Sequence, residues 1–93
     1  MAADKLTFYK GEKREVTATV TSKNPMDTVV VASAKFELRK SSSKTLVQKG
    51  SCEVSGNEAT ALLDLAEKGE FELKVTFFVG REEVIDKTTV VVE

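Results

Sequence analysis

The 93-residue sequence lacks histidine and tryptophan and contains one cysteine and one proline. Histidine is the commonest general base and metal ligand in proteins, so its absence removes most catalytic and metal-binding designs. Zinc needs several cysteine or histidine ligands, and this chain offers one. Cys52 has no second cysteine to pair with, which excludes the disulfide scaffolds of small secreted domains. These absences predict a protein that is not an enzyme and that holds no cofactor and no metal.

The remaining chemistry-bearing residues carry no recognisable catalytic motif. The five glycines form neither a dinucleotide-binding nor a Walker loop. Ser51 and Glu53 give Cys52 no positive charge that would favour its thiolate, so we interpret Cys52 as a half-buried strand residue.

Two acidic groups are the remaining candidates for a metal site. Neither group has the loop spacing that calcium requires, and both alternate with lysine and arginine. We therefore interpret both as solvated, salt-bridging surfaces. The groups are Asp64, Glu67 and Glu70, and Glu82, Glu83 and Asp86.

Charges of both signs are interleaved along the chain. Fourteen basic and 15 acidic side chains give a net charge of -1, with no basic stripe to neutralise phosphates. We therefore expect no nucleic-acid partner. No run approaches the roughly 18 apolar residues of a membrane helix, and the first residues lack the pattern of a secretory signal. We expect a protein that is cytoplasmic when synthesised and does not insert into a membrane.

The clearest structural signal lies at residues 70–80, where apolar and polar residues alternate. A period of two places the apolar side chains on one face of an extended strand. This strand predicts a core face that needs a second sheet to cover it. The apolar residues are Phe71, Leu73, Val75, Phe77 and Val79.

Similar alternation predicts further strands along the whole chain. In residues 14–22, Val16, Ala18 and Val20 face one way and three threonines face the other. We expect a loop at residues 23–27, a bend near Ala32 and Ser33, and a break at Gly50. The expected strands cover residues 5–9, 14–22, 28–40, 44–49, 51–55, 58–65, 70–80 and 83–93.

Residues 58–68 fit both helical and strand spacing. Because all neighbouring segments read as strands, we favour a strand to about Leu65, followed by one short helical turn near residues 64–69. Seven to eight short strands separated by turn signals predict an all-β, antiparallel β-sandwich. We expect residues 1–93 to form this single domain.

Several segments resemble immunoglobulin-like domains of bacteriophage and prophage tail, baseplate and particle proteins. The acidic–small–glycine–aromatic order of residues 64–73 is similar to the corner that precedes a late strand in such domains. Phe71 replaces the usual tyrosine and Leu73 the cysteine of antibody domains, which places the chain nearer the bacterial and viral members. The other matching segments are residues 7–12, 16–21, 34–39 and 69–73.

The resemblance implies a non-catalytic particle-assembly or adhesion module, incorporated in a virion or phage-like particle. We expect protein partners, either further copies of the chain or other particle subunits. The last strand is apolar enough to be a partner-binding edge at Val84, Ile85, Val90, Val91 and Val92, unless it is paired on both sides.

The alternative is a module that binds carbohydrate or another ligand. Such sites use exposed aromatic platforms, and the alternation points Tyr9 and Phe78 away from the core.

Overall fold

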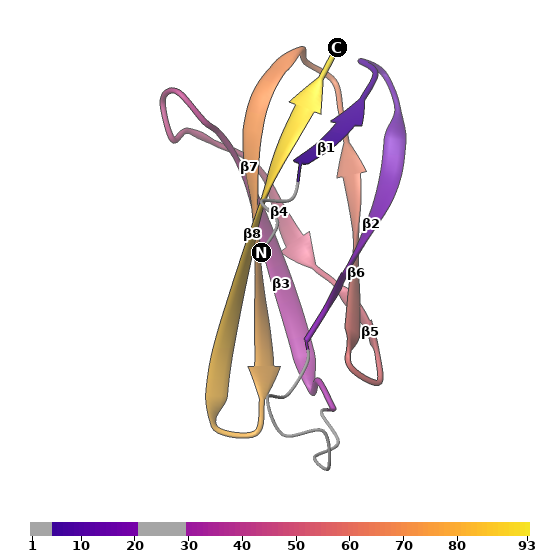
Figure 1. The fold of residues 1–93 in the computed structure, drawn as a ribbon, viewed down its shortest axis with the longest axis vertical. Coiled ribbons are helices and arrows are strands. Elements are labelled where there is room, and N and C mark those ends of the chain that lie inside the picture. The colour runs from indigo at the N-terminus through magenta and orange to yellow at the C-terminus, as the bar shows by residue number, and fades with distance from the viewer. Residues whose placement is uncertain (1–4, 21–29) are drawn as a thin grey trace.

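The structure, a computed structural model, describes residues 5–20 and 30–93, which form eight strands and no helix (Figure 1). The strands lie in two sheets, and the predicted all-β, sandwich-like architecture is therefore confirmed. Their bounds are β1 Lys5–Phe8, β2 Lys13–Thr19, β3 Ser33–Lys40, β4 Leu46–Ser51, β5 Glu53–Ser55, β6 Glu58–Asp64, β7 Gly69–Val79 and β8 Glu82–Val92. The loop predicted at residues 23–27 lies outside the described residues.

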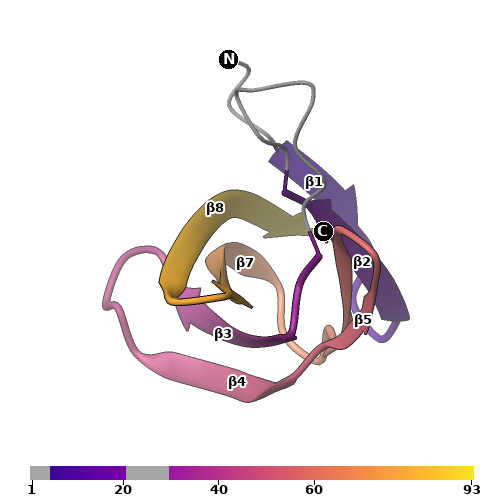
Figure 2. The same ribbon diagram turned by 90° about the horizontal axis from the view of Figure 1, so that it is seen from below.

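The larger sheet has five strands in the order β1-β8-β7-β3-β4, and the smaller has three in the order β2-β6-β5. Figure 2 shows the larger sheet curving along one side of the molecule, with β2 and β5 on the other. One pair breaks the predicted antiparallel pattern, because β1 runs parallel to β8 with Lys5 opposite Thr89.

The parallel pair follows from the turn after β1. Lys10 donates its N–H to the Glu93 carbonyl at 2.8 Å, and Gly11 donates to the Leu65 carbonyl at 2.7 Å. Gly11 has a φ of 93°, a conformation that costs glycine little. The chain therefore leaves the larger sheet here and enters the smaller one, instead of folding back as a hairpin.

Strand β7 is the predicted central ladder. Phe71, Leu73, Val75 and Phe77 are buried between the sheets, and Val79 is half-buried against the same core. β7 pairs along one edge with β3 and along the other with β8. A strand with a neighbour on each side has its backbone groups satisfied throughout, so β7 anchors the larger sheet.

The predicted bend near Ala32 carries the chain between the sheets. Val31 donates its N–H to the Gly56 carbonyl beside the smaller sheet, whereas Ala32 donates to the Phe78 carbonyl of β7. Cys52 makes the return crossing between β4 and β5, with its N–H bound to the Ala34 carbonyl at 2.9 Å.

Gly50 does not break its strand, contrary to the sequence prediction. It lies within β4 opposite Phe36, and a Cβ at Gly50 would lie 3.1 Å from Cε1 of the Phe36 ring. The glycine leaves room for this buried ring, so its role is packing.

Residues 58–68 contain the predicted strand, which ends at Asp64 as β6. The short helical turn predicted near residues 64–69 is wrong. Leu65 remains extended alongside the chain before β2, donating its N–H to the Glu12 carbonyl at 2.9 Å. Gly69 then begins β7 with a φ of 137°. These backbone bonds to a neighbouring segment replace the local bonds that a helical turn would make.

The two sheets share one hydrophobic core. Its most deeply buried large side chains come from four strands, β3, β6, β7 and β8, and face one another between the layers. Fully burying one such side chain contributes about 1.5–3 kcal/mol to stability. These side chains are Leu38, Leu63, Leu73, Phe77 and Val90.

Candidate functional site

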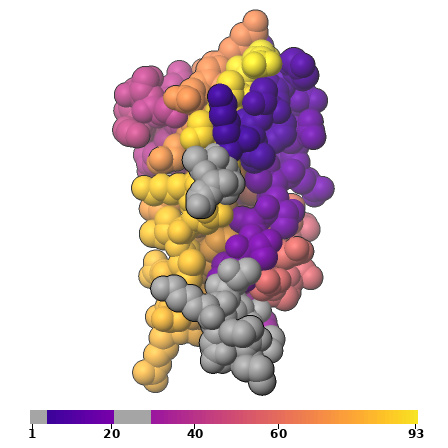
Figure 3. All heavy atoms as spheres, in the orientation of Figure 1, coloured from indigo at the N-terminus to yellow at the C-terminus, as the bar shows by residue number. Residues whose placement is uncertain are grey.

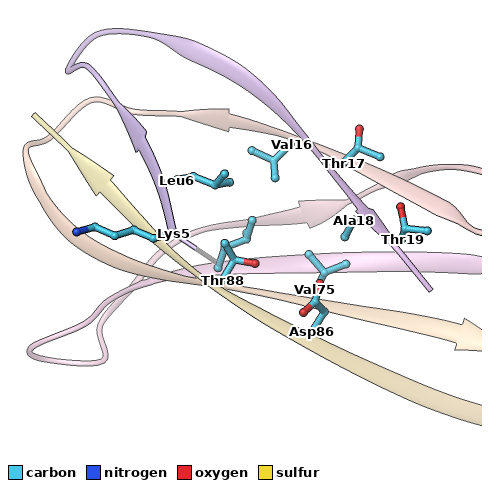
Figure 4. A pocket seen from close by; sticks show the side chains of 10 residues that line it. Lys5, Leu6, Val16, Thr17, Ala18, Thr19, Val75, Asp86 and Thr88 are labelled. Carbon is cyan, nitrogen blue, oxygen red and sulfur yellow. The ribbon is translucent and has the colours of Figure 1, made fainter. Parts of the chain in front are cut away.

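A cleft of about 390 Å³ lies on one side of the sandwich, between β2 of the smaller sheet and β1, β7 and β8 of the larger one (Figure 4). We call this side of the molecule the open side; Figure 3 shows atoms of β8 in yellow and of β2 in violet on it. The cleft is lined by Lys5, Leu6, Val16, Thr17, Ala18, Thr19, Leu73, Val75, Asp86 and Thr88.

The interior of the cleft is apolar because inward-facing core residues meet there. Leu6, Val16 and Ala18 are only half-buried, although they pack against the buried core. Leu73 and Val75 of β7 lie beneath them. The core is therefore incompletely covered on this side.

The polar wall of the cleft comes from β8. Val84 packs against the core and Val90 is buried, so residues of the same parity in this strand face inwards. Asp86 and Thr88 have that parity, and both line the cleft. Among the described residues Asp86 forms no ion pair and accepts no side-chain hydrogen bond, as the three ion pairs of the structure lie elsewhere. A carboxylate that has no ion pair among the described residues thus lines the cleft across from Val16 and Ala18 of β2.

Sequence reasoning placed Asp86 on a solvated, salt-bridging face together with Glu82 and Glu83. The structure shows no ion pair of Asp86 among the described residues, and its register position opposite Val75 directs it to the inner side of the sheet, where it is half-exposed in the cleft. Extending the alternation of β8 backwards from Val90 would have found it.

The outer edge of β2 leaves backbone groups available. Among the described strands, β2 pairs with β6 alone. Val20 donates its N–H to the Asn57 carbonyl at 2.9 Å, so the backbone groups of Val20 face the β6 side. In an antiparallel pair, residues whose backbone groups face the partner strand alternate with residues whose backbone groups face away from it. Ala18 therefore directs its backbone groups towards β6, while Thr17 and Thr19 direct theirs towards the open side.

Strand β8 has a second such edge, but a shorter one. Glu93 donates its N–H to the Phe8 carbonyl at 2.8 Å, which fixes the parity of the residues that face β1. The β7–β8 register is continuous, so Ile85 and Lys87 direct their backbone groups to the same edge. Among the described strands, β1 pairs with this edge only from Thr89 onwards. Ile85 and Lys87 therefore have no described partner strand on this edge.

The predicted binding edge at the end of the chain is wrong for Val90, Val91 and Val92. These residues lie between β1 and β7, and Val90 and Val92 are buried. The short first strand pairs with β8 here, an arrangement that alternation alone does not reveal. Val84 and Ile85 lie on the part of β8 that pairs only with β7 among the described strands. Their binding to a partner stays a prediction.

The two predicted aromatic contacts lie far apart. Tyr9 is 66% exposed and follows the end of β1 that pairs with Val92. Phe78 lies opposite Glu83, at the other end of β8, and is half-buried with the Lys35 ammonium 5.6 Å from its ring centroid. The structure therefore does not bring the two rings together as one platform. A carbohydrate site at either ring stays a prediction.

The described residues offer little to other chemistry. Burial raises the pKa of the Cys52 thiol, which disfavours the reactive thiolate. Within residues 5–20 and 30–93 no three potential ligand side chains are grouped as a metal would need. The same residues contain no helix that could span a membrane.

When the sequence was compared with protein-family models and with curated proteins, neither comparison gave a match.

Proposed function

We propose that the chain is an immunoglobulin-like β-sandwich that binds protein partners and performs no catalysis. Strand order supports the immunoglobulin-like assignment: β8-β7-β3 and β2-β6-β5 correspond to the G-F-C and B-E-D sets of such domains. β4 takes the place of the additional strand that variable-type domains have beside strand C. β1 lies beside β8, so the smaller sheet has no further described strand outside β2.

The open side carries the proposal. It combines incompletely covered core residues with backbone groups that have no described partner. An added strand satisfies both features at once, because its backbone bonds the free edge and its alternate side chains enter the cleft. Small-molecule sites, in contrast, rely on a few convergent polar groups within a largely enclosed pocket. A protein segment is therefore the better occupant.

The biological setting that we propose is a phage-type particle, where the domain assembles with neighbouring subunits or mediates adhesion. The resemblance of residues 64–73 and the other matching segments supports this setting. A domain of about 6,237 Å² of accessible surface has room for more than one contact of about 800 Å². Particle fractions from the source should contain the chain, and its exclusion from every such fraction would contradict the setting.

Binding through the open side is tested with two proline variants as baits. Thr17→Pro removes an N–H that points to the open side, whereas Val54→Pro changes a residue of the same sheet's other edge strand. The native chain and Val54→Pro should retain the same partner from an extract of the source cell or particle, and Thr17→Pro should lose it. Equal retention by all three baits, or no retained protein together with no self-association, would contradict the proposal.

A further inference from the structure

We propose that the partner of the β2 edge is the β2 edge of a second copy of this chain. Two smaller sheets would then join across a two-fold axis into one antiparallel sheet. This inference rests on the proposed function and deepens it by naming the occupant of the open side.

Two strands border the cleft with free edges, and their inward residues differ. The free part of β8 points Asp86 inwards, and an inward charge on an edge strand discourages the addition of an apolar strand there. β2 instead has two successive inward positions that are apolar, Val16 and Ala18, and its inward-parity charge, Arg14, lies next to the start of the strand. The β2 edge is also free among the described strands over its whole length, Lys13–Thr19. Strand addition is therefore favoured at β2.

Pairing the whole of β2 with itself fixes one register. Val16 then lies opposite Val16 of the second copy, and Glu15 lies opposite Thr17. This register joins the residues whose amides face the open side, and it places no like charges directly opposite one another. Centring the pair on Glu15 instead would place two carboxylates face to face. Two-fold pairing about Val16 thus satisfies both the backbone and the charges.

Charge complementarity supports the same register. Arg14 of the second copy lies opposite Ala18, and Ala18 lines the cleft together with Asp86 on the facing sheet (Figure 4). Within its own chain Arg14 is half-exposed and on the inward parity of β2, with Nη1 3.4 Å from Oε2 of Glu12 and the guanidinium carbon 4.9 Å from the Phe8 ring centroid. Because an exposed pair of this kind contributes little, Arg14 exchanges Glu12 for Asp86 of the second copy in the proposed dimer. The second copy thus supplies the cation that Asp86 lacks among the described residues. The two-fold axis makes this ion pair twice.

The first experiment is sedimentation equilibrium of the full chain at concentrations up to about 1 mM, which detects even millimolar association. The native chain and Val54→Pro should form a dimer and no larger species, whereas Thr17→Pro should stay a monomer. Circular dichroism and denaturant unfolding establish that both variants are folded. A native monomer at every concentration, or a dimer unaffected by Thr17→Pro, would overturn the inference.

A charge swap tests the ion pair independently of the backbone. Arg14→Asp and Asp86→Arg should each raise the dimer Kd about ten-fold or more, because each places like charges together in the cleft. The double variant should restore dimerisation, a result that local damage to either strand does not produce. Dimerisation that is equal in all variants, or that fails to return in the folded double variant, would overturn the ion pair.

The two experiments distinguish a failure of the inferred dimer from a failure of the proposed binding function. If the chain is strictly monomeric but its open side retains another protein in the proline-variant test, the second copy is excluded and the binding function stands. If it neither dimerises nor retains a protein, both fail.

Discussion

The edges of the two sheets meet on two sides of this sandwich, and the two sides differ in how well the chain itself connects the sheets. On the side of β4, which we call the closed side, the chain crosses between the sheets at Cys52, and the Gln48 side chain bridges the sheets. The Gln48 amide donates to the Leu62 carbonyl at 3.5 Å and accepts the Asp64 N–H at 3.1 Å. On the open side a cleft of about 390 Å³ separates β2 from β8.

The difference between the closed side and the open side indicates which side contributes mainly to stability and which is available to a partner. On the closed side, the crossing at Cys52 and the hydrogen bonds of Gln48 hold the two sheets together within the chain. On the open side, Thr17 and Thr19 direct amides towards solvent and Val16 is only partly covered. We infer that substitutions on the closed side act mainly on the free energy of unfolding, and those on the open side mainly on association.

The largest difference is expected from matched leucine truncations. Leu38 lies opposite Gln48 on the closed side and is 1% exposed, whereas Leu6 on the open side is half-buried. Leu38→Ala should lower the free energy of unfolding by about 2–5 kcal/mol. Leu6→Ala should cost only about 1 kcal/mol, because less area is lost. Urea unfolding at low protein concentration measures both; equal losses would contradict the comparison.

Added volume should have opposite effects on the two sides. Gly50→Val forces methyl groups towards the buried Phe36 ring and should cost about 1–3 kcal/mol. Ala18→Val places its additional methyl groups in the cleft and should be neutral or stabilising by up to about 1 kcal/mol. Thermal unfolding of both variants tests this pair. A destabilised Ala18→Val variant would show that the cleft has no room.

Two polar substitutions give a smaller contrast. Gln48→Ala removes the bridge between the sheets and leaves the Asp64 N–H without its partner, at a cost of about 1 kcal/mol. Thr17→Val removes an exposed hydroxyl that lies 2.9 Å from the Thr60 hydroxyl, and should cost less than about 0.5 kcal/mol. Denaturant unfolding distinguishes the two. A larger loss for Thr17→Val would reverse the assignment of the two sides.

The smallest effect concerns the thiol at the closed-side crossing. Burial raises the pKa of Cys52, so the folded chain keeps the thiol proton to higher pH than the unfolded chain does. The resulting stability is fully present below the unfolded pKa and is lost as the pH rises through the folded pKa. The rate of alkylation by iodoacetamide should therefore rise at a higher pH in the folded chain than in urea. Coincident pH profiles would contradict a burial effect.

Alternation in the sequence predicted which residues face the core. Phe71 to Phe77 in β7 and the partly covered face of β2 follow the predicted pattern. The strand at residues 58–65 was predicted from its context and is present, one residue shorter, as β6. Each of these features belongs to a single strand. A pattern of period two shows which residues lie on each face of a single strand, so it was sufficient to predict them.

Pairing was not predictable in the same way, because alternation contains no information about neighbours. The parallel pairing of β1 covers the edge of β8 at Val90 and Val92. The Phe36 ring occupies the space next to Gly50, which accounts for a glycine within β4. The cleft was missed because it depends on which strands end each sheet. The inward direction of Asp86 was missed because its acidic neighbours suggested an outer face, although its parity with Val90 directs it inwards.

The central claim, that β2 is the interacting edge, is tested most directly by amide hydrogen exchange resolved by residue in dilute and concentrated solutions. We predict that the amides of Thr17 and Thr19 exchange rapidly when the chain is dilute and become protected when it is concentrated. The amides of Ile85 and Lys87, on the free edge of β8, should exchange at the same rate in both solutions. Protection at Ile85 and Lys87 instead, or no change at Thr17 and Thr19, would contradict the claim.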